Sequence, residues 1–106
     1  MSEISTIAII TAKPGFGPDV EQALRQLAAA SQGVAGCLLY SLQQGMRDPD
    51  VFVTVEKWDS LDSLEAHLAS DHLAEALELT RHLLATEPQI IPAQPLAVGE
   101  PAKSTY

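Results

Sequence analysis

The side chains best suited to chemistry lie between residues 56 and 72, where carboxyl, indole and imidazole groups follow one another closely. Glu56 and Trp58 are two positions apart, and His67 comes later in the same stretch. Imidazole and carboxyl groups exchange protons in many protein sites, whereas an indole ring packs against apolar or aromatic surfaces. The stretch therefore combines proton-exchanging groups with a large aromatic side chain.

The spacing predicts that these groups meet in a pocket. Residues two apart on a strand point to the same face, so Glu56 and Trp58 share a face with Phe52. A helix that follows this strand directly can fold back over it, with His67 at the edge of its apolar stripe. Asp71 comes one helical turn after His67 and is placed to hold one of its ring nitrogens.

Each of these residues also has an ordinary structural explanation, which the sequence leaves open. Trp58 and His67 fit a core position, and Glu56 fits a rim carboxylate paired with a surface cation. His72 lies beside a predicted helix break, where a capping or surface position explains it. Tyr40 lies in the middle of a strand, where it either packs or hydrogen-bonds a ligand.

Six elements must position these side chains. Clusters of Pro, Gly, Asp and Ser separate strands over residues 4–12, 36–44, 51–58 and 89–98 from helices over residues 17–33 and 60–85. The second helix is expected to break or restart at residues 70–72, and Pro92 and Pro95 place the last strand at a sheet edge. The order βαββαβ predicts an α+β, ferredoxin-like fold with a four-stranded antiparallel sheet. Another small α+β sandwich is the alternative.

The strands are apolar on both faces, although two helices can cover only one. In the second strand, alternation places Cys37 and Leu39 on one face and Leu38, Tyr40 and Leu42 on the other. The first and third strands are also apolar on both faces. Soluble proteins avoid exposing a broad apolar surface, so the sequence predicts a homodimer with its sheets packed face to face.

Composition limits the remaining classes. The chain has 106 residues, 46% of them hydrophobic, which predicts one ordered domain, placed over residues 1–98 with a flexible tail over 99–106. The net charge of −8 disfavours nucleic acid and an anionic membrane surface as partners. The single cysteine cannot form an intrachain disulfide, which fits a reducing compartment and predicts a cytoplasmic protein.

The sequence does not predict a metal site or a common catalytic motif. Asp71 and His72 are adjacent and diverge around a helix, and no second ligand-rich segment accompanies them and His67. We find no nucleophile elbow, phosphate-binding loop or dinucleotide fingerprint.

Two stretches resemble the antibiotic biosynthesis monooxygenase family, which includes the quinol monooxygenases. They are residues 53–60, which contain Glu56 and Trp58, and residues 64–72, which contain His67. Residues 36–40 match the glycine-led second strand of the family, and the resemblance extends over residues 4–98. It implies a ferredoxin-like fold whose sheets pair into a dimeric α+β barrel.

The resemblance also implies an activity. The best-studied members oxygenate polycyclic phenols or hydroquinones with molecular oxygen and without metal, flavin or haem, because a phenolate can give an electron to oxygen directly. On the matching positions His67 would be the base, helped by Asp71, and Trp58 would line the slot. The other implied substrate contacts are Glu56, Tyr40, Phe52 and His72. The implied partners are a small aromatic substrate, molecular oxygen and a second copy of the chain, with no cofactor.

Other activities of the family fit less well. Haem-degrading members use an asparagine on the first strand, and residues 4–12 contain none. Members that act on phosphorylated compounds need cations, and this chain has only six Lys and Arg without an evident cluster. A non-catalytic small-molecule-binding dimer and an isomerase that uses the same pocket stay open, because fold does not determine function.

Overall fold

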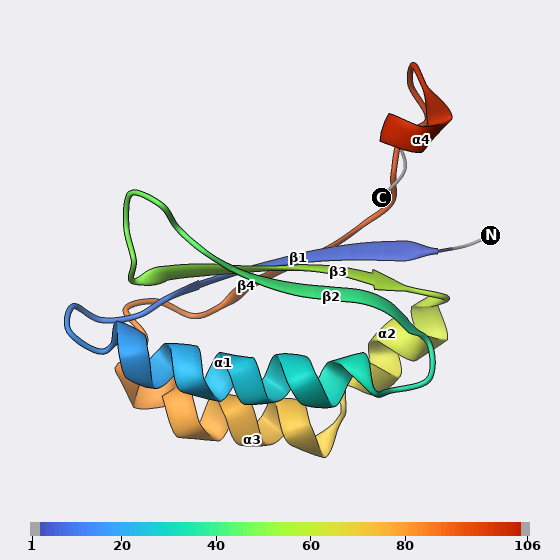
Figure 1. Cartoon of the computed structure of the whole chain (residues 1–106). Helices are drawn as coiled ribbons and strands as arrows, with labels where there is room; N and C mark the ends of the chain where they lie inside the picture. The colour runs from blue at the N-terminus through green and yellow to red at the C-terminus, as the bar shows by residue number, and fades with distance from the viewer. Residues whose placement is uncertain (1–2, 105–106) are drawn as a thin grey trace.

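The computed structural model describes residues 3–104 and confirms the predicted α+β, ferredoxin-like fold. Residues 1–2 and 105–106, at the outer ends of the predicted domain and tail, lie outside the described part. A four-stranded antiparallel sheet packs on one face against the helices (Figure 1). The elements are β1 (Ile4–Thr11), α1 (Gly17–Gln32), β2 (Cys37–Gln44), β3 (Val51–Trp58), α2 (Leu61–Leu68), α3 (Asp71–Thr80), the 3-10 turn η1 (Arg81–Leu83), β4 (Gln89–Ala93) and α4 (Pro101–Ser104). Within residues 3–104, no helix is long and apolar enough to cross a membrane.

The sheet has the strand order β2-β3-β1-β4, so β3 and β1 form its centre. These two strands pair along their whole length, from Ile4 opposite Trp58 to Thr11 opposite Val51. Burial alternates strictly along β3, and the buried side chains face the helices. The shared face predicted from the spacing is therefore confirmed, with Glu56 and Trp58 on the helix side.

Serine caps turn the chain from β3 into the helices that cover the site. The Ser60 side chain accepts a hydrogen bond from the Ser63 backbone N–H at 3.2 Å and begins α2. Ser70 caps α3 in the same way through the backbone N–H of Leu73 at 3.3 Å. The predicted interruption of the helix is thus confirmed, and it places His67 in the last turn of α2, facing the core.

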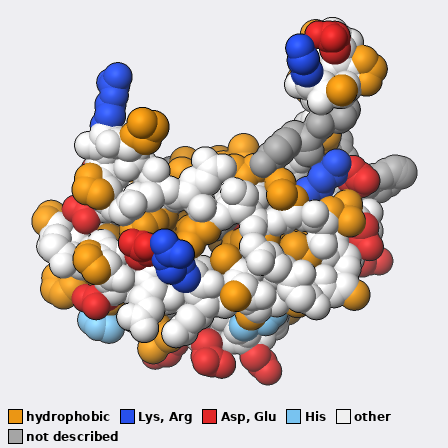
Figure 2. Space-filling model, in the orientation of Figure 1, with side chains coloured by type: hydrophobic (Ala, Val, Ile, Leu, Met, Phe, Trp, Pro, Cys, Tyr) orange, Lys and Arg blue, Asp and Glu red, His pale blue; other side chains and the backbone are white. Residues whose placement is uncertain are grey.

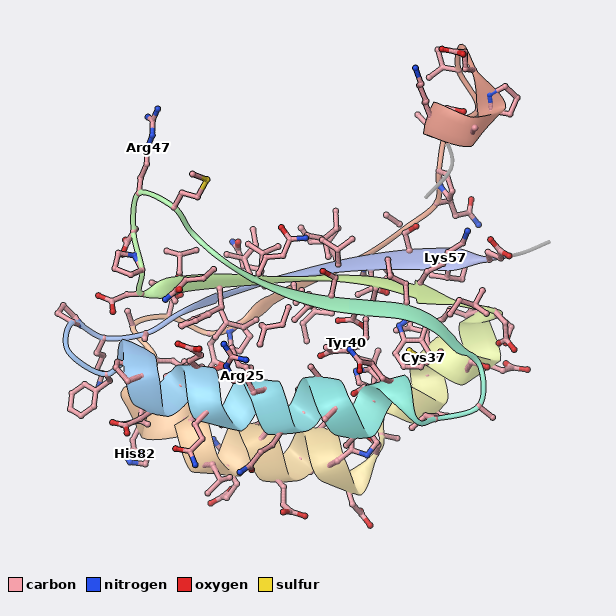
Figure 3. The ribbon with its side chains drawn as sticks, viewed as in Figure 1. Arg25, Cys37, Tyr40, Arg47, Lys57 and His82 are labelled. Atoms are coloured by element: carbon pink, nitrogen blue, oxygen red, sulfur yellow. The ribbon has the colours of Figure 1, made fainter. Side chains whose placement is uncertain are left out.

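The predicted faces of β2 are wrong at its first residues. A register shift lies between Cys37 and Leu39, and it leaves Leu38 52% exposed. Cys37 instead packs against the core, on the same side of the sheet as Tyr40 (Figure 3). A β-bulge inserts a residue into one strand, so strict alternation fails across it.

The last strand lies at the sheet edge, as its prolines predict, but it ends at Ala93 instead of residue 98. Pro92 lies opposite Thr6, and Pro95 follows just after the strand; neither has an N–H group to donate to a ladder. The chain then rises away from the sheet, and α4 stands clear of the other elements (Figure 1). The boundary between domain and tail at residue 98 stays a prediction.

The sheet face opposite the helices is apolar and largely uncovered (Figure 1). Ile7 and Ile91 face each other across β1 and β4, and they are 39% and 48% exposed. Val53 and Val55 are half-buried and point to the same face from β3. Figure 2 shows hydrophobic side chains along the rim of this face, whereas Asp and Glu gather on the helical side. The predicted excess of apolar surface is therefore present.

Candidate active site

A cavity lies between the sheet and the helices, in the layer into which Tyr40 points (Figure 3). Thr6 of β1, Tyr40 of β2 and Glu56 of β3 contribute polar groups to its floor, and most of its remaining wall is aliphatic. The volume open to the centres of water molecules is about 40 Å³, which holds only a few waters. An aromatic ligand must therefore displace wall side chains, such as Leu68, which is 40% exposed.

Glu56 is the polar centre of the floor and is only 3% exposed. Its Oε2 accepts a hydrogen bond from Thr54 Oγ1 at 2.7 Å, and its Oε1 accepts one from Trp58 Nε1 at 3.0 Å. Thr54, Glu56 and Trp58 alternate along one strand, so the period of the strand brings the three side chains together. Both carboxyl oxygens are thus bound within the protein.

His67 lies over this carboxyl group and is 4% exposed. Its Nε2 is 3.9 Å from Glu56 Oε1, too far for a hydrogen bond but close enough for electrostatic coupling. Its ring packs on Trp58, with centroids 4.6 Å apart and planes inclined by 31°, and Tyr40 approaches edge-on at 5.8 Å. The other ring nitrogen, Nδ1, is buried without a hydrogen-bond partner among the described residues.

Burial is the main cause of the pKa shifts of His67, Glu56 and Tyr40. It lowers the pKa of His67 from 6.5 to about 4, with a smaller contribution from the charge of His72. It raises the pKa of Glu56, although the hydrogen bonds from Thr54 and Trp58 oppose the rise. Burial, followed by the negative charge of Glu56, raises the pKa of Tyr40 as well. At neutral pH His67 is therefore an uncharged proton acceptor.

The structure brings some of the predicted site residues together and separates others. Glu56, His67 and Tyr40 line the cavity. Trp58 is fully buried behind His67 and does not line the cavity, and Phe52 is buried away from it, on the side of a surface groove between α1 and β2. His72 lies outside the cavity wall, with its ring centroid 5.8 Å from that of His67.

Asp71 does not hold His67, in contrast to its predicted role. The Asp71 side chain is exposed in the first turn of α3. In the described part of the chain, His67 Nδ1 has no hydrogen-bond partner, and Nε2 faces Glu56. The spacing of four residues joins side chains only within one helix. Because α2 ends at Leu68 and α3 begins at Asp71, that geometry does not apply.

Thr6 is the site residue that the sequence reasoning missed. It lies directly opposite Glu56 on β1, and Tyr40 lies directly opposite Glu56 on β2, so the three form a row across the floor. Thr6 is 1% exposed, and its Oγ1 has no hydrogen-bond partner among residues 3–104. Its only signal in the sequence is a hydroxyl group on the same strand face as Ile4 and Ala8.

The arrangement does not suggest a metal centre. Within the described part of the chain, no group of three or more His, Cys, Asp or Glu side chains could hold an ion. The site instead offers an uncharged imidazole, a hydrogen-bonded carboxyl group and the hydroxyl groups of Thr6, Tyr40, Thr54 and Thr80 in an otherwise aliphatic wall. It is suited to a small, largely apolar ligand that carries a few polar groups.

The fold defines a small α+β protein with a ferredoxin-like sheet, and the imidazole and carboxyl group in its apolar cavity form a candidate ligand site. The family model described as Antibiotic biosynthesis monooxygenase matches residues 4–79, and the chain belongs to this family. The predicted family is thereby confirmed. A comparison with curated proteins finds no significant match.

Several solved structures are similar to this chain in sequence and share its fold. PA3566 from Pseudomonas aeruginosa is 34% identical, with a TM-score of 0.85 over 92% of this chain and 97% of the other. A conserved protein from Methanosarcina mazei is 26% identical, with a TM-score of 0.80 over 87% and 91% of the two chains. An antibiotic biosynthesis monooxygenase at 23% identity, with a TM-score of 0.83 over 89% and 99%, shares the fold.

Proposed function

We propose that the cavity is the active site of a monooxygenase that oxidises a quinol or a polycyclic phenol with molecular oxygen and without a bound cofactor. The observation that carries this proposal is the buried imidazole of His67 beside Glu56, at the wall of a mostly aliphatic cavity. Membership of the antibiotic biosynthesis monooxygenase family supports an oxygenase over an unrelated activity.

His67 is the group proposed to take the phenolic proton. Its Nδ1 has no hydrogen-bond partner among residues 3–104, and its lowered pKa keeps the ring uncharged at neutral pH. The transfer forms an imidazolium beside a phenolate, and opposite charges in contact stabilise each other strongly where water is excluded. Glu56, 3.9 Å from Nε2, adds to this stabilisation when it is ionised. Trp58 positions both groups through its hydrogen bond and its ring contact.

The phenolate supplies all the electrons that reduce oxygen. It passes one electron to dioxygen, and the substrate radical then combines with superoxide to form a carbon–oxygen bond. The resulting peroxide takes the proton back from His67, and its oxygen–oxygen bond breaks with loss of water. A hydroquinone and dioxygen thus give a hydroxyquinone and water, with one oxygen atom in each product. The aliphatic wall shelters the superoxide stage from water.

The proposed functional unit is a homodimer. The uncovered sheet face carries the exposed Ile7 and Ile91 next to Val53 and Val55, all on one side of the molecule. An apolar face of this kind is unfavourable in water, and a second copy packed on it removes the exposure. The proposed small-molecule partners remain an aromatic substrate and molecular oxygen.

The proposal is tested by oxygen uptake on a panel of hydroquinones and anthrones. We expect turnover by the wild type, and a loss of about 10²–10⁴-fold in His67→Ala, the usual contribution of a general base. His82→Ala is the matched control, because His82 is exposed on the helical side of the molecule (Figure 3). Binding without uptake would favour the non-catalytic alternative, and equal rates in the two variants would remove His67 from the mechanism.

A further inference from the structure

Two polar atoms at the cavity lack partners. Of the described side chains that line the cavity, Thr6 and His67 each bury one polar atom, Oγ1 and Nδ1, without a hydrogen bond. Buried polar groups are nearly always hydrogen-bonded, because an unsatisfied one has lost its hydrogen bonds to water without replacing them. The proposed function uses Nδ1 and leaves the Thr6 hydroxyl unexplained.

The neighbouring polar groups already make hydrogen bonds within the protein. Glu56 uses both oxygens for Thr54 and Trp58, and the Thr80 hydroxyl donates to the Ala76 carbonyl oxygen at 2.8 Å. Thr6 lies opposite Glu56 in the middle of the sheet, and its hydroxyl group makes no hydrogen bond to any residue that the structure describes. A hydroxyl group both donates and accepts, so it can bind a ligand hydroxyl or carbonyl oxygen.

We propose that Thr6 binds a second oxygen atom of the substrate, so that the site selects aromatic compounds with two oxygen substituents over monophenols. One oxygen is bound by His67 from α2, and the other by Thr6 from β1. The ring lies between them against the aliphatic wall. This inference rests on the proposed function only in taking the ligand to be phenolic, and it assigns Thr6 a positioning role.

The test measures binding without oxygen, so that turnover does not enter. Hydroquinone and phenol are titrated calorimetrically into the wild type and into Thr6→Val, which replaces the hydroxyl with a methyl group of similar size. One hydrogen bond corresponds to a loss of about threefold to tenfold in hydroquinone affinity, with phenol affinity unchanged. Thr6→Ser restores the hydroxyl and is expected to restore the preference for hydroquinone.

Thr80→Val is the matched control, because Thr80 lines the same cavity but its hydroxyl is already bound to Ala76. We expect it to keep the wild-type ratio of the two affinities. Thr6→Val is expected to unfold at the same or a higher urea concentration than the wild type, because it removes an unsatisfied buried hydroxyl. A marked loss of stability would show that the hydroxyl is already bound in the free protein, which would overturn the inference.

The proposed role of Thr6 would be overturned if Thr6→Val lowered the affinities for hydroquinone and phenol equally, or if it lowered neither. A wild type that binds neither hydroquinone nor phenol would overturn it as well. Thr6-dependent selectivity without oxygen uptake would uphold the role of Thr6 and reject the oxygenase. Oxygen uptake that depends on His67 but not on Thr6 would uphold the oxygenase and reject the role of Thr6. The two proposals can therefore fail separately.

Discussion

Replacing His67 with phenylalanine tests whether the fold holds the imidazole uncharged. The variant keeps an aromatic ring against Trp58, where the two ring centroids are 4.6 Å apart, and removes the titrating nitrogens. The pKa of His67 is lowered from 6.5 to about 4 in the folded protein. Between these pH values the unfolded chain binds a proton that the folded chain does not. The contribution of the His67 pKa difference to the free energy of unfolding is therefore fully present above pH 6.5 and is lost as the pH falls towards 4.

The size of the effect follows from the two pKa values. One pKa unit corresponds to about 1.36 kcal/mol. With a pKa of 6.5 unfolded and about 4 folded, the wild type should lose about 2 kcal/mol relative to His67→Phe between pH 7.5 and pH 5. Glu56 of β3, Tyr40 of β2 and His72 of α3 also face this ring, and they are present in both proteins.

Urea unfolding followed by the fluorescence of the single tryptophan gives the free energies. Both proteins are measured at one concentration, because the stability of a dimer depends on concentration. A difference below about 0.5 kcal/mol between the two pH values would show that the pKa of His67 is not shifted. A wild type that gains stability at pH 5 would show an imidazolium paired with the Glu56 carboxylate, and it would refute the reasoning from burial.

Two further predictions concern the dimer and a strained turn. Val53→Glu places a charge on the uncovered sheet face, so sedimentation should show that the proposed dimer dissociates to monomers. The control Ala74→Glu changes an exposed residue of α3 and should remain dimeric. A Val53→Glu variant that stays dimeric would place the interface elsewhere. Gly36→Ala should lower the free energy of unfolding by about 1–3 kcal/mol, because Gly36 has φ +93° and a Cβ there would collide with Ser63. Gly99→Ala, at φ +68° with open space around it, should cost less in the same urea assay; an equal cost would rule out the collision.

The fold could be predicted because its signals are local. Serine caps, glycine stops and prolines act within a few residues, and the structure confirms the restart of the helix at Ser70 and the edge position of β4. The bulge at Leu38 could not be predicted, since pairing with Trp58 and Lys57 of the neighbouring strand decides it. Strict alternation therefore placed Cys37 on the wrong face.

The candidate site could be predicted only in part, because contacts between distant parts of the chain decide which side chains meet. The strand period correctly put Glu56 and Trp58 on one face, but it does not say which of them reaches the cavity. The predicted contact between Asp71 and His67 is wrong because one helix ends and another begins between them, so their spacing of four residues does not make them neighbours. Thr6 was missed because its meaning depends on what lies opposite it in the assembled sheet.

The capacity of this site for selective binding follows from the polar atoms that the fold leaves unbound. Glu56 is the most unusual residue in the sequence of β3, and Thr54 and Trp58 each donate a hydrogen bond to one of its oxygens, so it has partners before any ligand binds. In the proposed site its main effect on a ligand is electrostatic and passes through His67. In the proposed site, direct recognition falls to His67 Nδ1 and Thr6 Oγ1, which come from a helix and a strand far apart in the chain. Packing α2 over the sheet brings both atoms to one cavity, so selectivity for a ligand with two oxygen substituents is expected only when that packing is intact.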